Sequence, residues 1–296
     1  MRLTLATSAA MTRLEVEDEL LLERCRRRGI PAEVRAWEAP LDDTPRLWII
    51  RTTWNYWRRL PEFLAWVDAV ASRAPLWNPP AVVRWNADKR YLLDLAERGL
   101  PIVPTACLAT ADPSTARPEE LRQTLDGHAW TRAIIKPRVS AGGSECLRLD
   151  RHQPATLSAA AEALAGRGPF LIQPFVETIS EHGERSLIFL HGRFSHAVEK
   201  HPGEGEHRVH LEYAGRQRRV DPRPAELALA SRCLDALPSP SPLCYARVDL
   251  LFAEDGAPLI SELELIEPSL YLDEAPDRVE AWADGLEALL AGAVPR

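Results

Sequence analysis

The chain lacks any run of the ~18 consecutive apolar residues that a membrane-spanning helix requires. Its first residues, MRLTLATSAAM, contain a short apolar run interrupted by Thr and Ser, which favours a strand over a signal peptide. The five cysteines form no CxxC pair and are odd in number, so we expect reduced thiols in a cytoplasmic protein. The net charge of −7 argues against nucleic acids and anionic membranes as partners.

What is present is the composition of an ordinary globular protein: 296 residues, of which 46% are hydrophobic and 27% charged. Apolar strands alternate with helices over the first third, which predicts a parallel sheet covered on both faces. From about residue 133 the pattern changes to strands, turns and fewer helices, so we expect an α/β fold with an α+β C-terminal part. The early helices are expected at about 15–28, 60–72 and 85–99, the last with Asn86 as its N-cap.

Residues 244–267, CYARVDLLFAEDGAPLISELELIE, are typical of a β-hairpin. The Asp-Gly pair at 255–256 is a signal for a two-residue turn between two alternating apolar runs. In that register, two pairs of charged side chains oppose each other on one face of the hairpin. The pairs are Asp249 with Glu262, and Arg247 with Glu264.

Three carboxylates on one small patch of sheet repel each other, and a single arginine does not neutralise them. A divalent cation would do so, since carboxylates combined with substrate phosphates are the ligands that Mg²⁺ uses. The simpler alternative is a solvent-facing strand with incidental charges, and the hairpin alone does not decide between the two.

A phosphate partner would need its own binding elements. The segment IIKPRVSAGGSE (134–145) offers Lys136 at a strand end and then a turn in which Gly142 and Gly143 allow close approach of backbone N–H groups to an anion. It is not a Walker A sequence, and by itself a Gly-Gly turn is more often a plain hairpin loop. Lys89, on the helix expected at 85–99, is equally ordinary in isolation.

Taken in order, the helix lysine, the strand-end lysine, the glycine turn, an apolar hinge and the carboxylate hairpin resemble the ATP-grasp superfamily, and within it the glutathione-synthetase-like ligases. The resemblance runs from about residue 46 to 269. It implies an ATP-grasp fold with a Rossmann-like pre-ATP-grasp domain at 1–84. The ATP-grasp domain then occupies 85–296, divided into a nucleotide subdomain with the small loop (85–172) and a C-terminal subdomain with the metal site (173–296).

The resemblance also implies the ATP site. Gln173 is expected near the adenine, the backbone of Val176 at its edge, Glu181 on the ribose and Arg185 toward the phosphates. Lys200 and Arg208, from the segment 199–215, would face the terminal phosphate or the substrate. The full nucleotide set is Lys89, Lys136, Ser140, Gly142, Gly143, Gln173, Phe175, Val176, Glu181 and Arg185.

The implied cofactors are ATP and two Mg²⁺ ions, with Mn²⁺ as an alternative metal. Asp249, Glu262 and Glu264 are the expected ligands, although the family usually has asparagine where this chain has Glu264. Arg247 would stabilise the oxyanion of the tetrahedral intermediate. The substrate is expected to contact Arg51, Thr52 and Asn55, from the motif RTTWNYW (51–57), together with Ser269. The tryptophans of that motif have packing as the alternative role.

The implied reaction is phosphorylation of a substrate carboxylate by ATP, followed by attack of an amine on the acyl-phosphate and release of ADP. RTTWNYW, LWNPPAVVRWNADKRYLLDL and ELELIEPSL are similar to motifs of the O-ureido-serine cyclo-ligases of cycloserine biosynthesis, in which the substrate's own nitrogen closes a ring. An intermolecular ligase of amino acids or dipeptides is the alternative, as is a kinase or an ATP-binding protein without ligase chemistry. A homodimer or homotetramer is left open. His201, His207 and His210 lack a fourth zinc ligand, so we expect a loop role for them.

Overall fold

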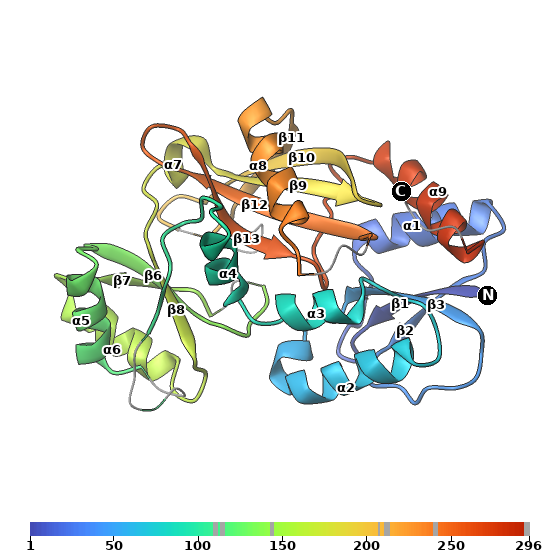
Figure 1. Ribbon diagram of the computed structural model, residues 1–296, viewed down its shortest axis with the longest axis horizontal. Coiled ribbons are helices and arrows are strands. Elements are labelled where there is room, and N and C mark those ends of the chain that lie inside the picture. Colours follow the sequence, from blue (N-terminus) through green and yellow to red (C-terminus); the bar gives the residue numbers. More distant parts are fainter. Residues whose placement is uncertain are drawn as a thin grey trace.

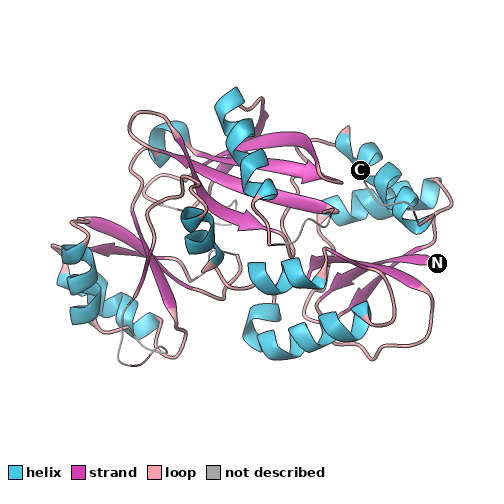
Figure 2. Ribbon diagram, in the orientation of Figure 1, coloured by secondary structure: helices cyan, strands magenta, loops and turns pink. Residues whose placement is uncertain are grey.

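The computed structural model describes residues 1–108, 112, 116–142, 145–206, 208–209, 214–238 and 242–292. Within these ranges the strands form three sheets (Figure 1). We call them the N-terminal sheet (order β2-β1-β3-β4), the small sheet (β5-β8-β6-β7) and the central sheet (β11-β10-β9-β12-β13). Figure 2 shows helices beside all three sheets, so the expected α/β class is confirmed.

The N-terminal sheet is parallel and covered on both faces, as its alternating apolar pattern predicts. Leu3 and Ile49 pack on one face with α1 and α9, whereas Trp48 and Ile50 pack on the other with α2. The C-terminal helix therefore belongs to the core of the first sheet. The elements are β1 (Arg2–Thr7), α1 (Val16–Arg27), β2 (Ala32–Ala36), β3 (Arg46–Thr52), η1 (Tyr56–Arg59), α2 (Leu60–Ala71), β4 (Leu76–Trp77) and α9 (Arg278–Leu290).

The single helix expected at 85–99 is wrong. The segment is divided between the end of α3 (Pro80–Asn86) and α4 (Tyr91–Glu97). Asn86 does not cap a helix start. Its side-chain amide donates to the carbonyl of Leu263 at 2.8 Å and accepts from the N–H of Leu265 at 2.8 Å. The edge of β13 supplies hydrogen bonds that a sequence pattern cannot reveal, and they end the helix there.

The small sheet has its own apolar core, made with α5 and α6. The expected subdomain boundary between residues 172 and 173 falls inside strand β8. The elements are β5 (Ala106–Cys107), α5 (Pro118–Gly127), β6 (Arg132–Pro137), β7 (Leu147–Asp150), α6 (Pro154–Ala163) and β8 (Phe170–Pro174).

The central sheet is antiparallel and lies between the other two parts (Figure 1). One face packs against α4 and α8, and part of the other packs against the core of α1 and α9. Its remaining surface is free to carry polar side chains. The elements are α7 (Ile179–His182), β9 (Glu184–Leu190), β10 (Arg193–His201), β11 (Arg216–Val220), α8 (Pro224–Asp235), β12 (Tyr245–Phe252) and β13 (Pro258–Glu264).

The hairpin of β12 and β13 has the predicted charged pairs, although its turn differs from the prediction. The N–H of Ala253 donates to the carbonyl of Ala257 at 2.9 Å, so the loop is longer than two residues and the first rungs are displaced by one. A register shift at Ser261 restores the alignment. The two pairs, Asp249 with Glu262 and Arg247 with Glu264, are therefore confirmed.

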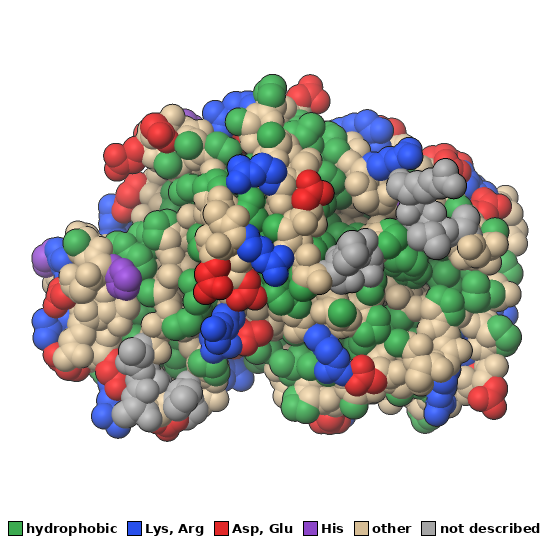
Figure 3. Space-filling view, viewed as in Figure 1, with side chains coloured by type: hydrophobic (Ala, Val, Ile, Leu, Met, Phe, Trp, Pro, Cys, Tyr) green, Lys and Arg blue, Asp and Glu red, His purple; other side chains and the backbone are tan. Residues whose placement is uncertain are grey.

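Within the described ranges, no helix is both long enough and apolar enough to cross a bilayer. On the face drawn in Figure 3, acidic and basic side chains are interspersed, without an extended patch of one sign.

Candidate active site

A cavity of about 760 Å³ lies where the three sheets meet, and side chains from all three parts line it. It collects residues that are far apart in the sequence, from Glu15 to Asp273. Most of the residues expected to bind nucleotide, metal or substrate line it. They are Lys89, Lys136, Ser140, Gly142, Gln173, Phe175, Val176, Lys200, Arg208, Arg247, Asp249, Glu262, Glu264 and Ser269. Gly143, His207 and His210 lie outside the described residues.

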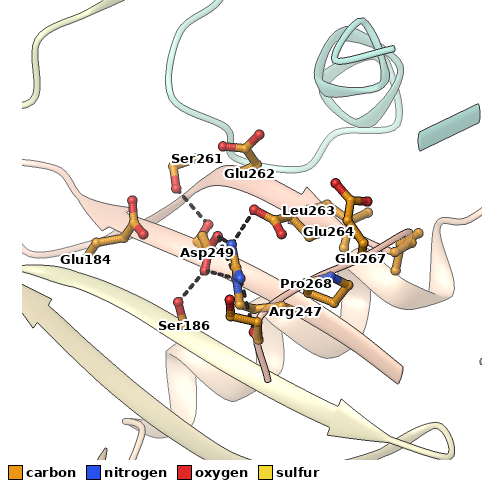
Figure 4. Close-up of polar contacts among 12 residues, drawn as sticks. Glu184, Ser186, Arg247, Asp249, Ser261, Glu262, Leu263, Glu264, Glu267 and Pro268 are labelled. Atoms are coloured by element: carbon orange, nitrogen blue, oxygen red, sulfur yellow. Dashed lines mark hydrogen bonds and ion pairs between the residues drawn. The ribbon is translucent and has the colours of Figure 1, made fainter. Parts of the chain in front are cut away.

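Arg247 stands between two of the hairpin carboxylates (Figure 4). Its Nε–H lies 3.1 Å from each carboxylate oxygen of Asp249, and its Nη2 contacts Glu264. Asp249 also accepts a hydrogen bond from the hydroxyl of Ser186. The guanidinium is buried, so it needs these partners, and they hold its plane at a fixed position in the wall.

Glu262 points to a different set of cations. Lys89 Nζ lies 3.3 Å from its carboxylate and Lys136 Nζ lies 3.9 Å away. Lys89 Nζ also donates to the carbonyl of Ser140 at 2.6 Å, which ties the segment expected to cover the phosphates to the lysine. Two lysines from separate elements thus converge on one acid in the cavity.

Lys200 is the third lysine of the cavity wall and is almost wholly buried. Its Nζ contacts Glu184 and lies 3.8 Å from Asp249 Oδ1. Burial alone would lower the pKa of Lys200, but Asp249 and Glu184 outweigh it and raise the pKa above its usual value. The ammonium therefore stays charged inside the protein.

The local charges separate the acids of the cavity into two kinds. Burial alone would raise the pKa of Asp249, but Arg247 and Lys200 lower it to about 2. Lys136 and Lys89 likewise overcome burial at Glu262 and lower its pKa to about 2. Both side chains are ionised at neutral pH, as a cation ligand must be.

The pKa of Glu264 is raised to about 7, because burial outweighs the attraction of Arg247. The pKa of Glu267 is raised to about 8 by burial and by the nearby charge of Glu264. Both carboxyl groups hold a proton more readily than an ordinary glutamate.

Two of the residues expected to bind the adenine line the same cavity. Phe175 and Val176 line the cavity directly after β8. The amide of Gln173 donates to the hydroxyl of Thr105 at 2.9 Å, which fixes its orientation.

Three of the expected substrate residues are not among those that line the cavity. Arg51 is 1% exposed, and its guanidinium binds Glu17 and Asp18. Thr52 is buried and donates its hydroxyl to Thr7. Asn55 accepts from the indole of Trp37 and donates to Glu38. Each polar side chain has found a partner inside the N-terminal part. From the same motif, Trp54, Tyr56 and Trp57 line the cavity instead.

Glu181 and Arg185 are also displaced from their expected place. Both line a separate hollow of about 230 Å³, where Arg185 binds Glu199 at 2.6 Å and Glu226 at 3.4 Å. For Arg185 the reason is the alternation of β9, which turns residue 185 away from the cavity and residue 184 toward it, whereas Glu181 belongs to α7. Glu184 is therefore the hinge acid that faces the cavity.

Among the lining residues that the sequence reasoning did not name as site residues are Glu17, Glu184, Glu267 and Tyr271. Strand alternation could have identified Glu184 once the start of β9 was known. Glu267 lies in the quoted run ELELIEPS, but the period of two stops at Pro268. No local pattern marks Glu17 or Tyr271.

Within the described part of the chain, no three acidic, histidine or cysteine side chains converge as a ready-made metal site. The hairpin acids are instead held apart by Arg247 and the lysines. Their chemistry still fits Mg²⁺, because they are oxygen donors on one cavity wall, and Asp249 and Glu262 are ionised. A site completed by substrate phosphates is the usual Mg²⁺ arrangement.

Comparison with known proteins gives matches over both parts of the chain. Residues 3–78 match the N-terminal domain of D-cycloserine synthetase DcsG, and residues 107–251 match the ATP-grasp domain of prokaryotic glutathione synthetase. The cycloserine biosynthesis protein DcsG of Streptomyces lavendulae is 34% identical over 294 residues, which cover 96% of this chain and 97% of that protein.

Solved structures agree. The crystal structure of D-cycloserine synthetase DcsG superposes with a TM-score of 0.84 at 32% identity, covering 97% of this chain and 98% of that one. D-alanyl-alanine synthetase A of Vibrio cholerae, at 12% identity, covers 100% and 98% with a TM-score of 0.70, which shows a shared fold alone.

The fold and the cavity define an ATP-grasp ligase, an enzyme class that uses ATP and Mg²⁺ to form C–N bonds. Within that class the chain belongs to the DcsG family.

Proposed function

We propose that this enzyme is an intramolecular cyclo-ligase that acts on an O-ureido-serine-type amino acid, as part of the biosynthesis of an antibiotic. The observation that carries the proposal is the cavity itself, where cations and acids from three sheets surround one space. The names of its relatives, a cycloserine biosynthesis protein and a D-cycloserine synthetase, support the substrate.

The size of the cavity supports a small substrate. Its volume of about 760 Å³ is within the range of single-ligand pockets, yet it must hold ATP and substrate together. Little room is left for a peptide acceptor. This favours small amino acids over peptides as substrates, and the joining of two amino acids remains the second candidate.

The nucleotide is assigned to the part between the small and central sheets. The adenine would lie against Phe175 and Val176, with Glu184 rather than Glu181 toward the ribose. Lys89, Lys136 and Lys200 would neutralise the phosphates. Each lysine now faces an acid, so binding exchanges one charged partner for another and leaves no cation unpaired.

We assign two Mg²⁺ ions, replaceable by Mn²⁺, to Asp249, Glu262 and Glu264. Bound there, the metal would neutralise charge on the transferring phosphoryl group. Arg247 is already fixed beside Asp249 and Glu264, where it would stabilise the oxyanion that forms on the activated carboxylate. Its burial makes that interaction stronger than it would be in water.

The reaction would run in the cytoplasm, where ATP is available and the five free thiols stay reduced. The homodimer and homotetramer both stay compatible with this assignment.

The test is a screen for ADP release with Mg-ATP and both enantiomers of O-ureido-serine, single amino acids and dipeptides, with mass spectrometry of the products. The proposal predicts ADP only with the ureido acid, together with a cyclised product. ADP with paired amino acids would favour the intermolecular ligase. A stable phosphorylated product would favour a kinase.

A further inference from the structure

The segment that follows β13 is held unusually firmly. The indole N–H of Trp54 donates to the carbonyl of Glu267 at 3.2 Å. Nη1–H of Arg51 donates to the next carbonyl, that of Pro268, at 3.0 Å. Both donors come from the RTTW motif, which therefore contacts the cavity wall through the backbone of residues 267 and 268.

The next two residues are held in the same way. Nη1–H of Arg247 donates to the carbonyl of Ser269 at 3.1 Å. The N–H of Leu270 donates to the carboxylate of Glu17, with its shorter contact at 2.8 Å. Four consecutive residues, 267–270, are thus anchored by charged or aromatic side chains, and such anchoring is typical of a segment that must present a side chain precisely where chemistry occurs.

The side chain that this segment presents is Glu267. It lines the cavity, three residues beyond Glu264, and in Figure 4 it projects past the end of β13. Within the described ranges, its carboxylate pairs with no cation and accepts no hydrogen bond from another residue. Asp249, Glu262, Glu264 and Glu184, by contrast, each contact a lysine or an arginine.

Glu267 is half-buried and faces the cavity, so a ligand there can supply the hydrogen-bond partner that its carboxyl group lacks. The charges that act on it are those of Glu264 on β13, Arg247 on β12 and Lys89 before α4, and Tyr56 lines the same cavity. Arg247 is the residue assigned to the oxyanion. Glu267 therefore lies beside the place where the activated carbonyl would sit, and it can accept a hydrogen bond there.

From this geometry we infer that Glu267 binds the attacking nitrogen of the substrate and accepts its proton, with Trp54 and Arg51 as its positioning residues. The inference rests on the proposed function, because it requires an acyl-phosphate. It also gives the RTTW motif the role of holding the segment that carries Glu267, in place of the direct substrate contact expected from the sequence.

The step balances as follows. The nitrogen lone pair forms the new C–N bond, and the bond between the carbonyl carbon and the phosphate oxygen breaks. Its electron pair leaves with phosphate, while the nitrogen's proton passes to Glu267 and then to solvent. In its ionised form, the carboxylate of Glu267 can accept that proton directly as the C–N bond forms.

The test separates the two half-reactions with hydroxylamine, which attacks an acyl-phosphate as a neutral nucleophile and needs no enzyme base. Parent and E267Q chains are given Mg-ATP and O-ureido-serine, with and without hydroxylamine. We expect E267Q to form hydroxamate and ADP within about twofold of the parent, because carboxylate activation is intact. Formation of the cyclised product should fall roughly 10²-fold, which is the usual contribution of a positioned base.

Two further variants test the positioning. W54F keeps the ring but loses the N–H that holds the Glu267 carbonyl, so it should slow cyclisation by about tenfold and spare hydroxamate formation. The matched controls are W130F, in the small sheet away from the cavity, and E254Q, in the exposed hairpin loop. Both should behave like the parent.

Equal loss of hydroxamate and ring formation in E267Q would overturn the inference and indicate a metal-binding or structural role. Cyclisation at the parent rate would overturn it too. If E267Q failed to fold, W54F would decide by the same two readouts. A parent chain that released no ADP with O-ureido-serine would instead contradict the proposed substrate.

Discussion

Asp249 and Glu262 face each other across β12 and β13, yet they are held by different cations. Asp249 binds Arg247 and Lys200, whereas Glu262 is near Lys89 and Lys136. This arrangement keeps two ionised acids close together without a metal. When Mg-ATP binds, its phosphates would become the partners of the lysines, and its Mg²⁺ would become the partner of the acids.

The substitution D249N tests the metal assignment. Removing this charge should lower ADP formation by roughly 10²-fold or more, because the neutral amide is a poorer ligand and Lys200 and Arg247 lose their partner. The measurement is ADP release as a function of Mg²⁺ concentration. D255N, in the exposed hairpin loop, is the matched control. Turnover by D249N at the parent rate, with the parent's dependence on Mg²⁺, would show that Asp249 is not a ligand.

R51M tests the claim that Arg51 is structural. Glu17 and Asp18 would be left in the interior without their cation, which should cost about 3–5 kcal/mol of unfolding free energy. Urea unfolding followed by tryptophan fluorescence measures the change. R59M, which removes the exposed pair with Glu62 and the exposed guanidinium over the ring of Trp37, should cost much less stability than R51M. An R51M chain as stable as the parent would contradict this account.

Gly183 is predicted to be indispensable because of two constraints at one position. Its φ of +65° disfavours other residues, and a Cβ there would lie 2.6 Å from the carbonyl oxygen of Lys200. G183A should therefore move Glu184 or Lys200 and reduce both thermal stability and ADP formation. G192A is the matched control, since its φ of +75° is similar but a Cβ there meets nothing within 4 Å. The difference in melting temperature between G183A and G192A measures the effect of the clash alone. Equal melting temperatures would contradict the predicted clash.

His196 should make stability depend on pH. The pKa of His196 is lowered from an ordinary 6.5 to about 4, mainly by burial and in smaller part by the charges of Arg219 and Arg278. The hydrogen bond that Nε2–H donates to the carbonyl of Leu270 at 2.9 Å acts in the opposite direction. Between pH 6.5 and 4 the unfolded chain binds a proton that the folded chain does not, so stability falls as the pH falls through this window. The full effect is about 3 kcal/mol.

The measurement for His196 is urea unfolding at pH 7 and pH 5. The loss of stability on acidification should be smaller in H196Q than in the parent. H152Q, at an exposed position, should keep the parent's dependence. An H196Q chain that loses as much stability as the parent would indicate that other groups cause the effect.

Much of the fold could be predicted from local pattern. The period-two and helical stretches of the first third correspond closely to β1, α1, β3 and α2, because backbone geometry alone sets those periods. The charged pairs of the hairpin were also predicted, although the turn was not, since the shift at Ser261 compensated for the longer loop.

The substrate residues were not predictable in the same way. Arg51, Thr52 and Asn55 are polar residues in a distinctive motif, which favours function, but each is satisfied inside the N-terminal part. A polar side chain that finds buried partners and one that faces a cavity look alike in a sequence. The difference depends on which distant segment packs beside it, here the one containing Pro268.

By itself, then, the sequence determined the order of strands and helices, the opposed charges of the hairpin and the motifs that indicate an ATP-grasp ligase. Those features depend on short-range geometry and on residue type. Only the tertiary structure decided that Glu184 rather than Glu181 faces the cavity and that Glu267 stands there without a partner among the residues that the structure describes. Burial and charge pairing are properties of the assembled chain, and they assign each acid its partner.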